Sequence, residues 1–131
     1  MPITGIADRD AIQNEMPWEE RDVPKTLYGM LSETTQKYPT HKAISYQIFS
    51  APKSKAETLT WTELKDRTTQ CANMFRGLGI GPSDVVAYVL PNATETVITL
   101  LGGAVAGIAN PINPLLDAEQ IGAILRETGA K

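Results

Sequence analysis

Two groups of three glycines are the first residues whose spacing could bind a phosphate: Gly77, Gly79 and Gly81, and then Gly102, Gly103 and Gly107. The first group resembles a dinucleotide-binding loop, but that loop follows a strand and opens a helix. These glycines instead follow a helical pattern and precede an apolar run, so we expect a helix cap and a turn. The second group lacks the Gly-Lys-Ser/Thr ending of a phosphate loop, and its expected role is close packing.

Four further candidates for chemistry have simpler interpretations. His41 is the only histidine, and it lies in a polar turn without partners at metal-ligand spacing. Cys71 is the only cysteine, and it lies on the apolar face of a predicted helix, where it is expected to pack as a small hydrophobic residue. The Glu19–Asp22 cluster is expected to be solvated, and Asn92, although part of a glycosylation sequon, is expected to cap a helix. No catalytic, cofactor-binding or metal-ligating residue is therefore predicted.

Composition narrows the class of protein. The chain has 131 residues, of which 42% are hydrophobic and 21% charged, with a formal net charge of −3. It holds no Lys or Arg between Arg76 and Arg126, so nucleic acid is not an expected partner. The start of the chain lacks the pattern of a signal peptide, and the longest apolar stretch, Val97–Ala109, is too short to cross a bilayer. We expect one cytoplasmic domain without a transmembrane segment.

The first half of the chain predicts a lead-in, a helix and a hairpin. Residues 1–25 show no sustained periodicity and contain three prolines, which predicts an extended lead-in with Trp18 as a possible anchor. Apolar positions from Leu27 recur at helical spacing, and Pro39 ends that helix. The next segments of strand type, Ala43–Phe49 and Thr58–Thr60, predict an exposed hairpin across a polar turn.

A second helix has a clear start signal. Thr60 and Glu63 form a capping box, and Leu59 is placed to pack against Leu64. The predicted inner face consists of Trp61, Leu64, Thr68, Cys71, Ala72 and Phe75. The apolar run Asp84–Leu90 then predicts a central parallel strand covered by helices on both faces.

The last third repeats the order of helix and strand. Asn92 with Glu95 predicts another helix cap, and Ile108–Ile112 predicts a second strand. Pro111 and Pro114 lack N–H donors, so this strand must lie at an edge or leave the sheet. The final helix has a capping box at Asp117 and Gln120, and Leu116 is placed to pack against Ile121. Its predicted inner stripe consists of Ile121, Ile124 and Leu125. Gly129 is its predicted C-cap. Lys131 falls where the next strand should begin, so we expect an incomplete sheet whose exposed edge favours self-association.

Taken in order, several segments resemble AMP-forming acyl-CoA synthetases of the adenylate-forming superfamily. They are Thr26-Leu27-Tyr28, Leu59–Leu64, Gly79–Val86, Leu90-Pro91-Asn92 and Gly102–Leu116. The most specific stretch runs from Ala106 to Pro114, and the resemblance covers residues 26–131. The segment Ile48–Glu57 departs from the family, because it is longer and more polar than the hairpin typical there.

The resemblance implies that residues 26–131 are the N-terminal α/β subdomain fragment of a larger adenylating domain. The expected fold is a partial parallel sheet flanked by helices, with one exposed hairpin. The full-length enzyme would be a carboxylic acid–CoA ligase, with fatty acids as the expected substrates. It would use ATP, Mg²⁺ and coenzyme A, and it would form acyl-AMP before acyl-CoA. The family's phosphate loop, nucleotide-contact motifs and C-terminal lysine do not occur in this chain, so the fragment alone is expected to be inactive and to bind none of these cofactors.

Two alternatives remain open. Luciferases and the adenylation domains of peptide synthetases share this architecture, and the thiol acceptor would distinguish them from acid–CoA ligases. A stand-alone, non-catalytic binding module is the other alternative, motivated only by the end of the chain at Lys131.

Overall fold

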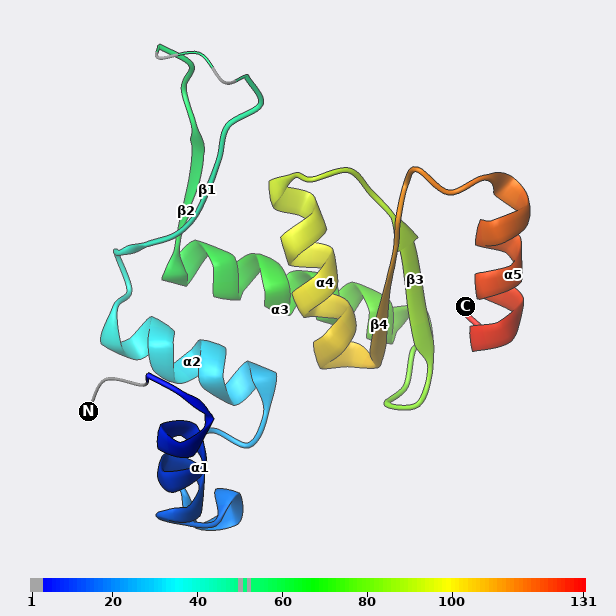
Figure 1. Cartoon of the computed structure of the whole chain (residues 1–131). Coiled ribbons are helices and arrows are strands. Elements are labelled where there is room, and N and C mark those ends of the chain that lie inside the picture. Colours follow the sequence, from blue (N-terminus) through cyan, green and yellow to red (C-terminus); the bar gives the residue numbers. More distant parts are fainter. Residues whose placement is uncertain (1–3, 50, 52) are drawn as a thin grey trace.

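The computed structural model describes residues 4–49, 51 and 53–131 (Figure 1). Its elements are α1 (Ile6–Asn14), the 3₁₀ turn η1 (Trp18–Glu20), α2 (Leu27–Lys37), β1 (Lys42–Tyr46), β2 (Glu57–Thr60), α3 (Trp61–Gly77), β3 (Val85–Val89), α4 (Thr94–Ala106), β4 (Ile108–Ile112) and α5 (Ala118–Thr128). β1 and β2 form an antiparallel hairpin, whereas β3 and β4 form a parallel pair with α4 and α5 on its two sides (Figure 1). This arrangement confirms the α/β fold class expected from the sequence.

One hydrophobic cluster joins the hairpin to the helices. Leu31 of α2, Leu59 of β2 and Leu64 of α3 are its buried members, each no more than 4% exposed. The partly buried residues packed against it are Ala43, Ile44, Trp61, Val97, Ile98 and Leu101. Leu59 and Leu64 belong to the same cluster, as the predicted contact across the start of α3 requires. On α2 the buried side is centred on Leu31 and Thr35, and Met30 of the same helix is exposed.

The ends of α3 are fixed by local hydrogen bonds. The predicted capping box is present, with the Thr60 hydroxyl accepting from the Glu63 N–H and the Glu63 carboxylate accepting from the Thr60 N–H. At the other end, Gly79 has a φ of +88°, and the N–H of Ile80 donates to the carbonyl of Phe75. This Schellman-type ending confirms that the glycines after α3 form a cap and turn.

Close approach of backbones fixes α4 in place. A Cβ added to Gly102 would lie 2.6 Å from the Cys71 Sγ of α3. A Cβ added to Gly107 would lie 2.5 Å from the carbonyl oxygen of Asp84 and 2.8 Å from that of Gly81. These positions therefore admit only glycine without a shift of neighbouring atoms, which confirms close packing as the role of this glycine group.

β3 is hydrogen-bonded on both edges where it begins. The carbonyl of Asp84 accepts from the N–H of Ile108 at 2.9 Å, and the carbonyl of Val85 accepts from the N–H of Lys131 at 3.0 Å. Successive carbonyls of a strand point to opposite edges, so Lys131 lies along the edge that β4 leaves free. The described sheet contains β3 and β4 alone, so the central position predicted for β3 stays a prediction.

The expectation of an extended lead-in over residues 1–25 is wrong for residues 4–25, and residues 1–3 lie outside the described part. Residues 6–14 form α1, and residues 18–20 form η1, although neither has a buried residue. Polar contacts hold these turns: the hydroxyl of Thr4 donates to the Asp8 carboxylate, and the Arg21 guanidinium donates to the carbonyls of Ile12 and Met16. Apolar periodicity therefore gave no signal for α1.

Trp18 does not anchor the lead-in through burial. Its side chain is 62% exposed, and the ammonium group of Lys25 lies 5.6 Å from its ring centroid. The same ammonium group donates to the carbonyls of Trp18, Glu19 and Arg21. Lys25 thus connects to η1 mainly through backbone oxygens, and the indole remains at the surface.

The predicted cap at Asn92 is also wrong. α4 begins at Thr94 with Ala93 as its N-cap, and no side chain caps that end. The hydroxyl of Thr94 instead donates to Glu57 of β2, and the hydroxyl of Thr96 donates to the carbonyl of Pro91. Contacts with the hairpin and with the preceding loop replace the local cap. By contrast, the predicted capping box at Asp117 and the αL residue Gly129 are both present in α5.

Alanine substitutions at the close-packed glycines should distinguish the steric cost of an added Cβ from the gain in helix propensity. Gly107→Ala is expected to lower the free energy of unfolding by about 1–3 kcal/mol, because its Cβ meets backbone atoms that belong to another turn. Gly103→Ala is the matched control, since the nearest heavy atoms lie 3.5–3.7 Å away and alanine favours the helix by up to about 1 kcal/mol. Urea unfolding followed by circular dichroism measures both. Equal losses in the two variants would contradict the packing explanation.

The ion pair beside β3 should make stability depend on acid pH. The Asp84 carboxylate accepts from the Lys131 ammonium at 2.7 Å and from the Gly81 N–H at 2.8 Å. These contacts lower the pKa of Asp84 below its ordinary 3.8, and the hydrogen bond with Lys131 has the largest effect. A depressed folded-state pKa stabilises the fold above the unfolded pKa, and this contribution disappears as the pH falls through the folded pKa.

Asp84→Asn removes the titrating group at this position. The difference in urea midpoint between the unmodified chain and Asp84→Asn is therefore expected to shrink between about pH 5 and about pH 2. Midpoints measured at several pH values test this expectation, and the subtraction cancels the other carboxylates of the chain. A difference that stays constant with pH would contradict it.

Candidate functional site

The carboxyl ends of the two parallel strands lie at one edge of the molecule. Val89 of β3 is paired with Ile112 of β4, so the loops that follow the two strands leave the sheet side by side. The β1–β2 hairpin rises at the same end of the molecule (Figure 1). In open α/β sheets, ligands bind at the carboxyl ends of the strands. We therefore take this edge as the candidate functional site.

A groove separates the hairpin from the β3–α4 loop. Its volume is about 380 Å³. Its lining residues are Tyr46, Ile48, Lys55 and Glu57 on the hairpin, and Pro91, Asn92, Ala93 and Glu95 on the other wall. The hairpin contributes a phenol, an ammonium group and a carboxylate, and the opposite wall contributes an amide and a second carboxylate. The groove therefore presents groups for hydrogen bonds and for ion pairs with a small molecule.

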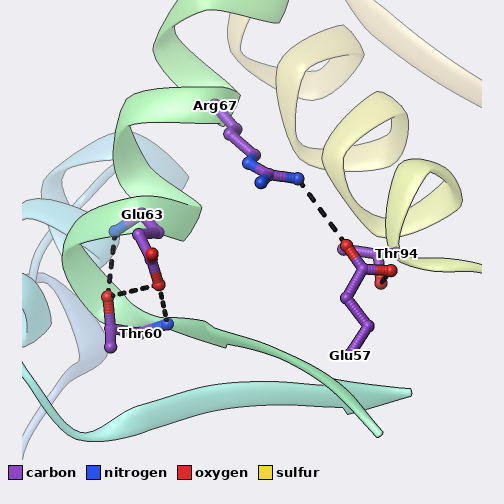
Figure 2. A network of polar contacts seen from close by, with 5 residues as sticks. All are labelled: Glu57, Thr60, Glu63, Arg67 and Thr94. Atoms are coloured by element: carbon purple, nitrogen blue, oxygen red, sulfur yellow. Dashed lines mark hydrogen bonds and ion pairs between the residues drawn. The ribbon is translucent and has the colours of Figure 1, made fainter. Parts of the chain in front are cut away.

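A polar contact fixes the distance between the two walls (Figure 2). Thr94, at the first turn of α4, is 1% exposed, and its hydroxyl donates to the Glu57 carboxylate at 3.0 Å. The other oxygen of Glu57 lies 3.8 Å from a guanidinium nitrogen of Arg67 on α3. Glu57 thereby connects β2 with both helices. The buried hydroxyl makes the Thr94 contact the stronger of the two, because the ion pair is half exposed to solvent.

The strand that carries Glu57 leads directly into the cap of α3 (Figure 2). The backbone N–H of Thr60 and, next, its hydroxyl donate to the Glu63 carboxylate, and these bonds lower the pKa of Glu63 below its ordinary value. The same carboxylate completes the capping box of α3. Its position on the first turn of α3 fixes the direction in which β2 meets the helix.

The turn after β4 forms the other part of the edge. Ile112 is 4% exposed, whereas Leu115, three residues later, is 89% exposed. The side-chain oxygen of Asn113 accepts from the N–H of Leu115 at 3.0 Å, which forms an Asx turn. In the part of the chain that the structure describes, β4 pairs with β3 alone, so Pro111 lies in an edge strand as its missing N–H requires.

The charges of the residues that line the groove do not fit a nucleoside triphosphate with bound Mg²⁺. Among the described residues that line the groove, Lys55 has the one positive charge, and Glu57 and Glu95 have negative charges. Elsewhere in the described chain, no three His, Cys, Asp or Glu side chains come together as a metal site. Adenylation requires concentrated positive charge around the phosphates. No step of such chemistry can be assigned to these residues.

The other candidate residues lie apart from the groove and from one another. His41 is exposed, and its ring contacts the edge of Tyr38 with centroids 5.3 Å apart. Cys71 is half-buried against α4, and burial raises the pKa of its thiol, so it packs as a small residue as predicted. The contact between Glu57 and Thr94 could not be predicted from local patterns, because the two residues are 37 positions apart.

The fold defines a class of protein: it is that of the N-terminal subdomain of adenylate-forming enzymes. The N-terminal domain of FACL13 from Mycobacterium tuberculosis superposes with a TM-score of 0.71 and 28% identity, over 82% of this chain and 26% of that chain. The family model for AMP-binding enzymes matches residues 31–131. The chain therefore belongs to the AMP-binding enzyme family, which confirms the resemblance read from its segments.

Curated relatives differ in their reactions. Marinolic acid–CoA ligase of Pseudoalteromonas sp. (strain SANK 73390) is 30% identical over 126 residues, which cover 96% of this chain and 19% of the relative. Gramicidin S synthase 2 of Aneurinibacillus migulanus is 28% identical over 108 residues, which cover 82% of this chain and 2% of the relative. The chain thus spans about a fifth of the ligase and a small fraction of the synthase. None of the helices in the described ranges is long and apolar enough to cross a membrane.

Removal of the Glu57 carboxylate should test how the two walls are held. Glu57→Ala leaves the buried hydroxyl of Thr94 without its acceptor, and it is expected to cost about 1–2 kcal/mol of unfolding free energy. Arg67→Ala is the matched control, because it removes only the exposed ion pair and should cost less than about 1 kcal/mol. Urea unfolding measures both variants. A larger loss in Arg67→Ala than in Glu57→Ala would show that the ion pair is the main contact.

Proposed function

We propose that this chain is the N-terminal part of an ATP-dependent carboxylic acid–CoA ligase that forms acyl-AMP and then acyl-CoA. The observation that carries the proposal is the match to marinolic acid–CoA ligase, which extends over 96% of the chain and so includes the lead-in. The domain from FACL13, at 28% identity, supports the same class. Fatty acids are the substrates that we favour, and the cofactors of the whole enzyme are ATP, Mg²⁺ and coenzyme A.

In this proposal the described residues act as a structural brace for a site completed by other parts of the polypeptide. The groove presents two carboxylates and one ammonium group, so it lacks the charge that would hold phosphates. The β3–α4 loop and the turn after β4 supply a fixed wall at the carboxyl edge. The chain by itself is accordingly expected to be inactive.

An adenylation domain of a peptide synthetase is the second candidate. Gramicidin S synthase 2 matches at 28% identity, close to the 30% of the ligase, so identity alone does not separate the two reactions. Both candidates share formation of an acyl or aminoacyl adenylate. They differ in the thiol that accepts the group: free coenzyme A in one, and a thiol tethered to a carrier domain in the other.

The experiment combines a mass measurement with an activity assay. The intact mass of the native gene product is measured first, and pyrophosphate release is then followed with ATP, Mg²⁺ and a panel of carboxylic and amino acids. We expect a product much heavier than the 14.2 kDa chain that releases pyrophosphate with an apolar acid and forms a thioester with free coenzyme A. The 131-residue chain is assayed in parallel and is expected to release none.

Each other outcome changes the proposal in a defined way. Adenylation of an amino acid without transfer to free coenzyme A would favour the peptide-synthetase reading. A native mass of 14.2 kDa without pyrophosphate release would overturn both enzyme readings and favour a binding module. Pyrophosphate release by the short chain would contradict the structural role assigned to it.

A further inference from the structure

The hairpin ends in two exposed apolar side chains. Ile48 is 73% exposed and Phe49 is 72% exposed, and both lie beyond the end of β1. They are adjacent in the sequence, and the hairpin that carries them projects from the molecule (Figure 1). Their exposure alone is not unusual, since Leu78 and Leu115 are exposed to a similar degree, so the inference depends on the charges beside them.

Hydrogen bonds give this end of the hairpin a defined conformation. The side-chain amide of Gln47 donates to the carbonyls of Ala51 and Ser54, at 3.1 Å each. The N–H of Ser54 donates to the carbonyl of Ala51 at 2.9 Å. These bonds close the loop on itself, and they involve none of the apolar side chains. Ile48 and Phe49 are therefore not needed for closure of the loop.

The same end of the hairpin is positively charged within an acidic chain. Lys53 and Lys55 follow the apolar pair across positions 50 and 52, which the structure does not describe. Among the described residues neither lysine forms an ion pair, and Lys55 lines the groove together with Ile48. The chain as a whole has a net charge of −3. Residues 48–55 hold these two lysines and no acidic residue, so the positive charge is local to this segment, whereas Glu57 and Glu95 line the groove beside Lys55.

We propose that Ile48 and Phe49, with Lys53 and Lys55, form a contact site for an anionic lipid surface. A projecting end with two large apolar residues exposes too little area for a protein partner, which typically covers about 800 Å² of each surface. Shallow insertion of a few apolar side chains between lipid headgroups needs no such area, and lysines add attraction to anionic lipids. The test of this site does not depend on the proposed ligase activity, because lipid binding needs no turnover.

Vesicle co-sedimentation of the 131-residue chain tests this site. The probes are vesicles of phosphatidylcholine alone and of phosphatidylcholine with about 30% phosphatidylglycerol. We expect binding to the anionic vesicles only, with a loss when the salt is raised from about 0.1 M to about 1 M. The double variant K53Q/K55Q should weaken binding about 25-fold, since each lysine near an anionic surface contributes roughly fivefold.

Apolar variants and a matched control complete the test. Ile48→Ser with Phe49→Ser should reduce binding at least about tenfold, because insertion loses its apolar surface. Leu115→Ser is the control: Leu115 is 89% exposed, but it lies in the stretch between Arg76 and Arg126 that has no Lys or Arg. All variants must keep the circular dichroism spectrum of the unmodified chain. Equal binding by all variants, or no binding to anionic vesicles, would overturn the proposal. A chain that binds an acidic polypeptide but not the vesicles would also overturn it.

Discussion

The absence of side chains at Gly102 and Gly107 is the constraint on which the rest of the structure depends. At Gly102 it lets α4 approach the Cys71 side chain of α3, and at Gly107 it lets the chain pass against the carbonyls of Gly81 and Asp84. α4 is thereby packed between the preceding helix and the turn that leads into β3. Because β4 starts one residue after Gly107, its register with β3 is set by the same contact.

The elements that the sequence predicted correctly are those whose signals are local. The capping boxes at Thr60 and Asp117 lie within four residues, and the apolar run of β3 is continuous, so each could be recognised without knowledge of the fold. Glycine patterns were informative for the same reason: a cap requires the left-handed conformation at Gly79 and Gly129. Most of the fold from Leu27 onward was predictable on this basis.

The parts that could not be predicted depend on polar contacts between distant residues or on weakly amphipathic helices. α1 buries no residue and is held by Arg21, which lies beyond its end, so no apolar pattern marked it. The start of α4 is displaced from Asn92 because the hydroxyl of Thr94 finds its acceptor on β2, 37 residues earlier. The candidate site could not be predicted for the same reason, because its groove lies between the hairpin and the β3–α4 loop, which are distant in the sequence.

Charge places a limit on what this edge can do alone. A polyphosphate brought to the groove would meet the carboxylates of Glu57 and Glu95 and one ammonium group, that of Lys55. Glu57 cannot turn away without leaving the buried hydroxyl of Thr94 unpaired, so its negative charge is fixed by the packing of α4. Nucleotide chemistry at this edge therefore requires positive charge from residues that do not line the groove. The same bond that holds the two walls together makes the groove unsuited to phosphate and better suited to a neutral or cationic group.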